Sequence, residues 1–241
     1  MQTLFYQPGI LTGVTHLNPE DSRHCVKVLR KKSGDTIYIT DGAGSIAEAV
    51  INDASSDRCI FRIQQTIQHA PRGYFFWLAV APTKNTDRME WLVEKCVEIG
   101  IDRISFIQTV HSERTNVNIE RIQKIAVSAM KQALLPFCPV IDPVLSFDQF
   151  IGSITSGQRF IAKGNAGNMH LMDSAKAGQA CTVLIGPEGD FTDDELSMAI
   201  HSGFIPVSLG NSRLRTETAG LSACLTISLI NRHLNQNLTQ P

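Results

Sequence analysis

Two short glycine-bearing segments in the last quarter of the chain hold the residues best suited to bind a small ligand. The first is Gly186–Gly189 and the second is Gly210–Arg215. Glycine lets the backbone approach a ligand closely and adopt positive φ, and Pro187 makes the first turn rigid. An isolated glycine turn is usually an ordinary connection, and neither segment has the pattern of a dinucleotide fingerprint or a P-loop. We therefore predict a small-ligand site of another kind.

Each glycine segment lies between a predicted strand and a predicted helix. Residues 182–185 form an apolar run that is typical of a buried strand, and residues 205–209 form another. Thr192–Glu195 is a capping box, which predicts that a helix begins there. A long apolar helix is expected to begin at Thr216 or Thr218. Because ligands bind at the carboxyl ends of strands in open α/β sheets, we expect both segments at one sheet edge.

The same alternation of strands and helices extends upstream. Apolar runs predict the strands, and apolar positions at helical spacing predict the helices. The predicted elements are a strand at 74–81, a helix at 87–99 that ends before Gly100, a strand at 103–108, a helix at 118–134 and a strand at 159–162. Residues 71–241 are therefore predicted to form one α/β domain.

The first 70 residues have a different pattern, which predicts a small β-barrel or sandwich. Short β-rich runs lie at 36–40, 47–51 and 59–67, and Asp41–Gly42 is a hairpin signal. One helix is expected from about Pro19 to Leu29. The segment 69–73 has the composition of a linker and separates the two predicted domains.

The predicted N-terminal helix carries most of a basic cluster. Arg23, Lys27 and Arg30 follow a spacing of four and three, which places them on one helix face, and Lys31 and Lys32 follow them. Such a face is often merely solvated, but it also suits RNA phosphates. The net charge of the chain is only −1, so the chain as a whole shows no nucleic-acid signature.

Composition excludes several other classes of protein. The chain has 241 residues, of which 43% are hydrophobic, and its six cysteines lack metal-ligand spacing. We predict buried core cysteines, no metal and no disulfide framework. No apolar run is long enough to cross a membrane, and the N-terminus lacks the features of a signal peptide. A cytoplasmic protein is expected.

Four motifs occur in an order that resembles the bacterial ribosomal RNA small subunit methyltransferase E family of the SPOUT superfamily. They are Lys95–Gly100, Ser112–Thr115, Leu184–Gly189 and the stretch Leu209–Ala219. The resemblance covers nearly the whole chain. It implies a PUA-like RNA-binding β-barrel at 1–70 and an α/β SPOUT methyltransferase domain with a deep trefoil knot at 71–241. It further implies a homodimer that uses S-adenosylmethionine to methylate N3 of one uridine in the 16S rRNA of the small ribosomal subunit.

The resemblance also assigns residues to roles. Arg114 and Arg215 are candidates for stabilising negative charge on the uracil, and Glu188 is a candidate for orienting an arginine or accepting a proton. RNA contact is expected at Arg23, Lys27, Arg30 and Lys31. The expected cofactor-binding residues are Leu184, Gly186, Pro187, Gly189, Leu209, Gly210, Leu214 and Arg215.

The sequence departs from the family's pattern in its arginines. No arginine lies within the first six residues, and Ser212 stands where many members have one, with Arg213 following. These changes bear on RNA contact more than on cofactor binding. Two alternatives stay open, a related knotted methyltransferase acting on tRNA or ribose 2′-OH, and a non-catalytic RNA-binding or ribosome-assembly protein.

Overall fold

The computed structural model describes residues 3–113, 116–164 and 169–237. It divides into two compact units, which are described separately below. Unit 1 contains the chain up to Pro71 together with Val127–Cys138. Unit 2 contains Arg72–Ala126 and most of the chain from Pro139 onward.

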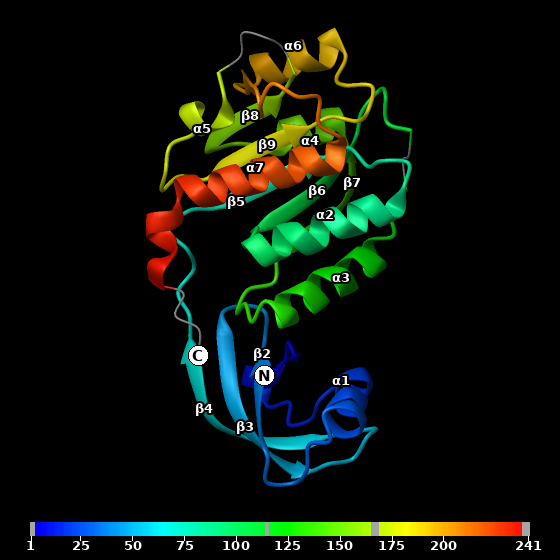
Figure 1. Cartoon of the computed structure of the whole chain (residues 1–241), viewed down its shortest axis with the longest axis vertical. Coiled ribbons are helices and arrows are strands. Elements are labelled where there is room, and N and C mark those ends of the chain that lie inside the picture. Colours follow the sequence, from blue (N-terminus) through cyan, green and yellow to red (C-terminus); the bar gives the residue numbers. More distant parts are fainter. Residues whose placement is uncertain (1–2, 114–115, 165–168, 238–241) are drawn as a thin grey trace. The chain divides into compact units, whose positions relative to one another are not determined.

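Unit 1 is built on a four-stranded sheet with the order β1-β2-β3-β4. Figure 1 labels three of these strands, β2, β3 and β4. Its strands are β1 (Leu4–Tyr6), β2 (Thr36–Thr40), β3 (Ser45–Asp53) and β4 (Ile60–Gln68). The hairpin predicted at Asp41–Gly42 joins β2 to β3, and Gly42 and Gly44 adopt the positive φ values of 72° and 110° that this turn requires. Among the described residues β1 and β4 do not pair with each other, so the sheet is open where the sequence predicts a closed barrel.

The helical segment of unit 1 differs from the predicted single α-helix. The helix α1 (Pro19–Arg23) begins at Asn18, whose side chain accepts a hydrogen bond from Asp21 N at 2.9 Å. It continues as the π-helical turn η2 (His24–Val28), and Arg30 beyond it has a φ of +56°. A π turn holds more residues than an α turn. The prediction of one α-helical face for Arg23, Lys27 and Arg30 is therefore wrong.

The core of unit 1 joins the sheet to this helical segment. Phe5, Leu17, Ile37, Ile39 and Phe61 are among its fully buried side chains. Residues 127–138 add contacts at the β2–β3 turn, where Gly44 N donates to Pro136 O at 3.0 Å. The short helix η1 (Ile10–Thr12) lies between β1 and α1.

Unit 2 contains a six-stranded sheet in which every pair of neighbours is parallel. Its order is β10-β8-β9-β5-β6-β7. The predicted strands correspond to β5 (Phe76–Val80), β6 (Arg103–Gln108), β8 (Gln158–Ala162), β9 (Cys181–Ile185) and β10 (Ile205–Val207), and β7 (Val140–Ser146) is an additional edge strand. Strand β10 ends two residues earlier than predicted, so Ser208 and Leu209 belong to the loop that follows it.

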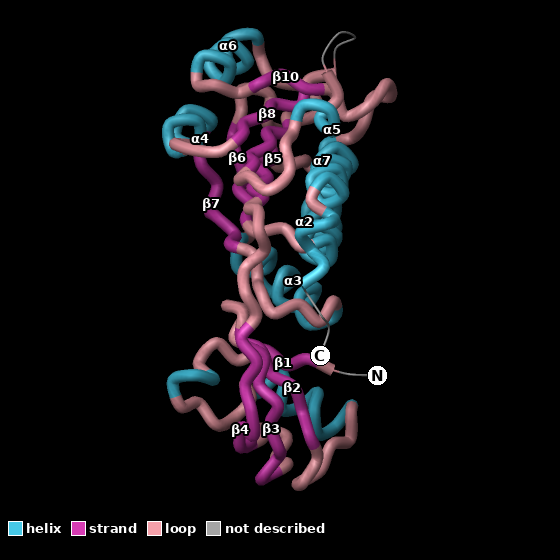
Figure 2. The backbone as a smooth tube through the Cα atoms, turned by 90° about the vertical axis from the view of Figure 1, so that its left-hand side faces the viewer, coloured by secondary structure: helices cyan, strands magenta, loops and turns pink. Residues whose placement is uncertain are grey.

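Helices cover both faces of this sheet (Figure 2). The helices α2 (Thr86–Ile99) and α7 (Thr216–Ile230) pack together on one face, and α4 (Phe147–Ser153) and α6 (Asp193–His201) lie on the other. The first pair approaches closely, because a Cβ at Gly220 would lie 3.1 Å from Leu92. The remaining helices are α3 (Ile119–Gln132), α5 (Leu171–Ser174) and η3 (Arg232–Asn237). None of the helices in the described ranges is long and apolar enough to cross a membrane.

The burial predicted for the cysteines is confirmed for most of them. Five of the six are buried and Cys138 is half-buried, and all six are free thiols. Burial raises the pKa of the Cys138 thiol to about 11 and that of Cys181 to about 12, because an apolar environment disfavours the thiolate.

Candidate functional site

The two glycine segments lie next to each other at the carboxyl edge of the sheet of unit 2. The loop after β9 and the loop after β10 are joined by two hydrogen bonds. Arg213 Nη2 donates to Glu188 O at 3.2 Å, and Thr216 Oγ1 donates to Gly186 O at 3.1 Å. The prediction that both segments meet at one sheet edge is therefore confirmed for the described structure.

A third loop, which follows β6, packs against the first one. Val110 N donates to Glu195 Oε1 at 2.9 Å, and His111 Nδ1 lies 3.0 Å from Asp190 O. A Cβ at Gly189 would lie only 3.0 Å from His111 Cβ. A side chain at Gly189 would therefore press against His111.

The loop after β9 has a fixed conformation. Asp190 N donates to Pro187 O at 3.0 Å, and Asp190 takes the left-handed φ of 63°. Lys163 Nζ lies 3.9 Å from Asp190 Oδ2 and donates to Phe191 O at 3.4 Å. These contacts preorganise the loop.

The loop after β10 is more open. Gly210 has a φ of +134°, which a side chain would strain, yet a Cβ there would meet no atom within 4 Å. Leu209 and Leu214 are half-buried, and Arg213 and Arg215 are exposed. The loop therefore offers backbone and leucine surface beside open space, which suits an apolar ring with a few polar groups.

The remaining candidates of unit 2 occupy varied positions. Leu184 is fully buried in the core, so its side chain cannot line an open site. Pro187 is buried, whereas Glu188 and Arg215 are exposed, and neither forms an ion pair with another described residue. Arg114 lies outside the described residues.

Two cations that do not belong to any of the sequence motifs, Arg88 and Lys84, also lie at this edge, each paired with a glutamate that lies within a motif. Arg88, in the first turn of α2, has its Nε 3.6 Å from Glu217 Oε1 in the first turn of α7. Lys84 Nζ lies 3.7 Å from Glu113 Oε2. Their only sequence signal is their position directly after a predicted strand or loop motif.

The predicted RNA-binding residues belong to unit 1. Arg23, Lys27 and Arg30 are exposed. Lys31 differs, because it is half-buried and its Nζ donates to Thr36 O at 3.2 Å. Three of the four cations are thus free to meet a phosphate from solvent, and the fourth also supports the start of β2.

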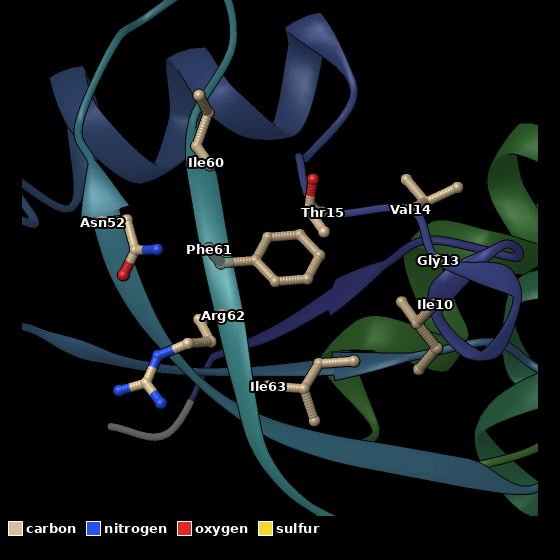
Figure 3. Close-up of a pocket in the computed structure, with 9 residues that line it drawn as sticks. All are labelled: Ile10, Gly13, Val14, Thr15, Asn52, Ile60, Phe61, Arg62 and Ile63. Atoms are coloured by element: carbon tan, nitrogen blue, oxygen red, sulfur yellow. The ribbon is translucent and has the colours of Figure 1, made fainter.

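Unit 1 also has a pocket of about 350 Å³ beside the edge strand β4 (Figure 3). Phe61 points towards Thr15 and Ile63 towards Ile10, whereas Arg62 points to the other side of the strand. None of the residues predicted to bind RNA or cofactor lines it. No motif in the sequence indicates this pocket.

The fold and the joined loops define a class of protein, an RNA methyltransferase with a PUA domain. Residues 74–228 match the family model described as an RNA methyltransferase domain, and residues 17–64 match the model described as an RNA methyltransferase PUA domain. The chain belongs to the ribosomal RNA small subunit methyltransferase E family.

Individual relatives agree with this assignment. The ribosomal RNA small subunit methyltransferase E of Rickettsia conorii is 26% identical over 217 residues, which cover 88% of each chain. The crystal structure of a probable rRNA-methyltransferase from Porphyromonas gingivalis is 40% identical, with a TM-score of 0.91 and coverage of 96% of this chain and 99% of that one. A methyltransferase of Legionella pneumophila, solved with bound SAM, is 25% identical with a TM-score of 0.86, covering 96% and 98% of the two chains.

Proposed function

We propose that this protein uses S-adenosylmethionine to methylate N3 of one uridine in the 16S rRNA of the small ribosomal subunit. The observation that carries the proposal is the joining of the two glycine loops by the Arg213 and Thr216 hydrogen bonds in a chain of this family. The relatives named for small-subunit rRNA methylation match almost the whole chain.

The loops fit this cofactor. The open space beside Gly210 and the half-buried Leu209 and Leu214 suit an adenine ring and its ribose. Contacts are expected from the backbone of Gly186, Pro187 and Gly189, from the end of β9 at Leu184, and from Arg215. The cofactor, when bound, supplies an electrophilic methyl group.

The residues of the chain must position the uridine and manage its charge. N3 of uridine carries a proton at neutral pH, so its loss leaves negative charge on the ring and its oxygens. Arg114 and Arg215 supply positive charge for this step, and Glu188 orients one of them or accepts the proton. The base must be unpaired or turned out of its stack to reach the loops.

The proposed function also assigns roles to the two domains and an oligomeric state to the chain. Residues 1–70 form the PUA-like RNA-binding domain, and residues 71–241 form the methyltransferase domain, whose C-terminal loops are tied in a trefoil knot. The protein is a cytoplasmic homodimer. The exposed apolar side chains of Leu225 and Leu229, 47% and 42% accessible on the outer face of α7, support self-association.

RNA binding by unit 1 is tested by reversing charge at Lys27 and Arg30. The double variant Lys27→Glu/Arg30→Glu should bind 16S rRNA fragments more weakly at low salt and keep its affinity for S-adenosylmethionine, because the two functions use different residues. Filter binding and calorimetry measure these two affinities. Unchanged RNA affinity would refute the assignment of this cluster.

The substrate is tested by nucleoside mass spectrometry of ribosomal RNA from a strain that lacks the gene. Loss of 3-methyluridine is expected, with restoration by the wild-type gene and not by Arg114→Ala. An unchanged amount of 3-methyluridine, with loss of another methylated nucleoside, would instead support the related methyltransferase acting on tRNA or ribose.

Catalysis is distinguished from mere RNA binding by calorimetric titration with S-adenosylmethionine. A non-catalytic RNA-binding protein has no need for the cofactor, whereas the enzyme should bind it with a Kd well below millimolar. Absence of heat at millimolar ligand would exclude the proposed activity.

A further inference from the structure

Glu217 has an unsatisfied carboxylate oxygen beside the joined loops. The residue is only 7% exposed, and its Oε2 has no hydrogen-bond partner among the described residues. It directly follows Thr216, which donates to Gly186 O in the first glycine loop. A buried acceptor without a donor is costly, and in native proteins it calls for a specific explanation.

The N-terminus of α7 explains only part of this arrangement. A carboxylate in the first turn of a helix is favoured by the helix dipole. That interaction does not require burial, and it leaves Oε2 without a donor. The second partner is Arg88 of α2, whose side chain is 36% exposed.

The pairing of Arg88 with Glu217 is loose compared with other arginine–carboxylate pairs in unit 2. Arg88 Nε lies 3.6 Å from Oε1, beyond the range of a good charge-assisted hydrogen bond. By contrast, Arg103 binds both oxygens of Asp142 at 2.7 and 2.9 Å, and Arg72 reaches Asp102 at 2.7 Å. The positive charge of the Arg88 guanidinium is therefore attracted to Glu217. Its N–H groups do not make a good hydrogen bond to that carboxylate and stay available for another acceptor.

We propose that Arg88 contacts an anionic oxygen of the RNA substrate and that Glu217 is the positioning residue that holds Arg88 beside the two glycine loops. This inference rests on the proposed function. A planar guanidinium presents five N–H donors, so one edge is turned towards Glu217 while the other meets the RNA.

The anionic oxygen has two possible sources, a backbone phosphate or the uracil ring that becomes negative as N3 loses its proton. A phosphate contact contributes to RNA affinity and to its salt dependence. A contact with the ring strengthens only as the charge develops, so it contributes to kcat and leaves RNA affinity almost unchanged. The two sources therefore give different kinetic signatures.

The experiment compares wild type, Arg88→Ala, Glu217→Gln and the double variant. It measures thermal stability, calorimetric affinity for S-adenosylmethionine, RNA affinity at several salt concentrations, and kcat and KM for methyl transfer to RNA. The control is Arg121→Ala, which removes another arginine–glutamate pair between helices, since Arg121 Nη2 donates to Glu90 Oε2 at 2.9 Å.

We expect Arg88→Ala to keep its cofactor affinity within about twofold and to lose RNA-dependent function. A ring contact predicts that kcat falls roughly 100-fold. A phosphate contact predicts weaker RNA binding and a salt slope reduced by about one unit. Glu217→Gln should produce the same type of defect to a smaller extent, and the double variant should be no worse than Arg88→Ala, because Glu217 acts through Arg88.

Three results would overturn the inference. The first is an Arg88→Ala protein with wild-type RNA affinity, salt slope and kcat. The second is additive loss in the double variant, which would remove the positioning role of Glu217. The third is a fall in thermal stability and cofactor affinity without any RNA-dependent defect, as a purely structural pair would give. If wild type itself transfers no methyl group, the proposed function fails, while the RNA affinities and their salt slopes still decide whether Arg88 contacts a backbone phosphate.

Discussion

At the scale of single residues, Gly189 and Gly210 disfavour a side chain for different physical reasons. Gly189 lies under His111, where a Cβ would meet His111 Cβ at 3.0 Å. Gly210 has open space around it and is instead required by its φ of +134°. An alanine at position 189 should therefore be relieved by removing its neighbour His111, whereas an alanine at position 210 should not.

Gly189→Ala should reduce the free energy of unfolding by about 1–3 kcal/mol, because the added methyl group forces the loop and His111 apart. The companion change His111→Gly should remove most of that loss, measured relative to His111→Gly alone, because it deletes the Cβ that the added methyl group would meet. Denaturant unfolding of the single and double variants measures both effects.

Gly210→Ala is the matched control, because its strain is in the backbone and no side chain crowds it. His111→Gly should not rescue it. If His111→Gly restored both glycine variants equally, or neither, the packing explanation for Gly189 would be wrong.

Cys181 gives a prediction about pH. Burial raises the pKa of its thiol to about 12, above an unfolded value near 9. A raised folded pKa gives stability that is fully present below the unfolded pKa and is lost as pH rises towards the folded pKa. At pH 10 this group should lower the free energy of unfolding by about 1 kcal/mol relative to pH 8.

The measurement compares unfolding at pH 8 and pH 10 for wild type and Cys181→Ala. The variant loses packing at both pH values, so the informative quantity is the difference between them. That difference should be smaller in Cys181→Ala. An identical pH dependence in the two proteins would show that this thiol does not contribute.

At the scale of elements, the N-terminus of α6 also holds the loop that follows β6. Glu195 is 6% exposed and completes the capping box with Thr192, and its Oε1 accepts from Val110 N. Thr192→Ala should cost about 1 kcal/mol, as loss of a helix cap does. Glu195→Ala should cost about 2–3 kcal/mol, because it also leaves the Val110 N–H without its acceptor.

Hydrogen exchange separates the two variants. Amide exchange at Val110 should accelerate in Glu195→Ala and stay near the wild-type rate in Thr192→Ala. Equal exchange rates at this amide in both variants would contradict the role of Glu195 in holding the loop.

Elements with a strong local pattern were predictable from the sequence. The central strands of unit 2 are continuous apolar runs, and the capping box of Thr192 and Glu195 predicts where α6 begins. Strand β7 was missed because it lies at a sheet edge and contains Asp142 and Pro143, which argue against a strand. The short helix α4 has too few residues to show a period.

The candidate site was predictable only in part, because some of its residues meet only through tertiary contacts. The two glycine segments are visible as strand–loop–helix junctions. The contact of His111 with Asp190 joins residues 79 positions apart, and the pair of Arg88 and Glu217 joins two helices. Such tertiary contacts leave no periodic signal in one sequence, and neither does the choice of a π turn at His24–Val28.

At the scale of the whole molecule, the outer face of α7 bears on the proposed homodimer. The helix is apolar nearly all round, which is typical of a helix that is buried on more than one side. Its inner face packs against α2 and the sheet, whereas Leu225 and Leu229 remain 47% and 42% exposed at a spacing that puts them on the same face. A second copy of the chain would cover them.

Leu225→Lys should therefore convert the protein to a monomer with little change in thermal stability, because it places a charge in the interface and not in the core of unit 2. Analytical ultracentrifugation should show half the wild-type mass. Val140→Lys is the control, because Val140 is 54% exposed on the edge strand β7 and its replacement should leave the mass unchanged. If Leu225→Lys sediments with the wild-type mass, α7 does not form the interface, and another face of the chain must account for any dimer.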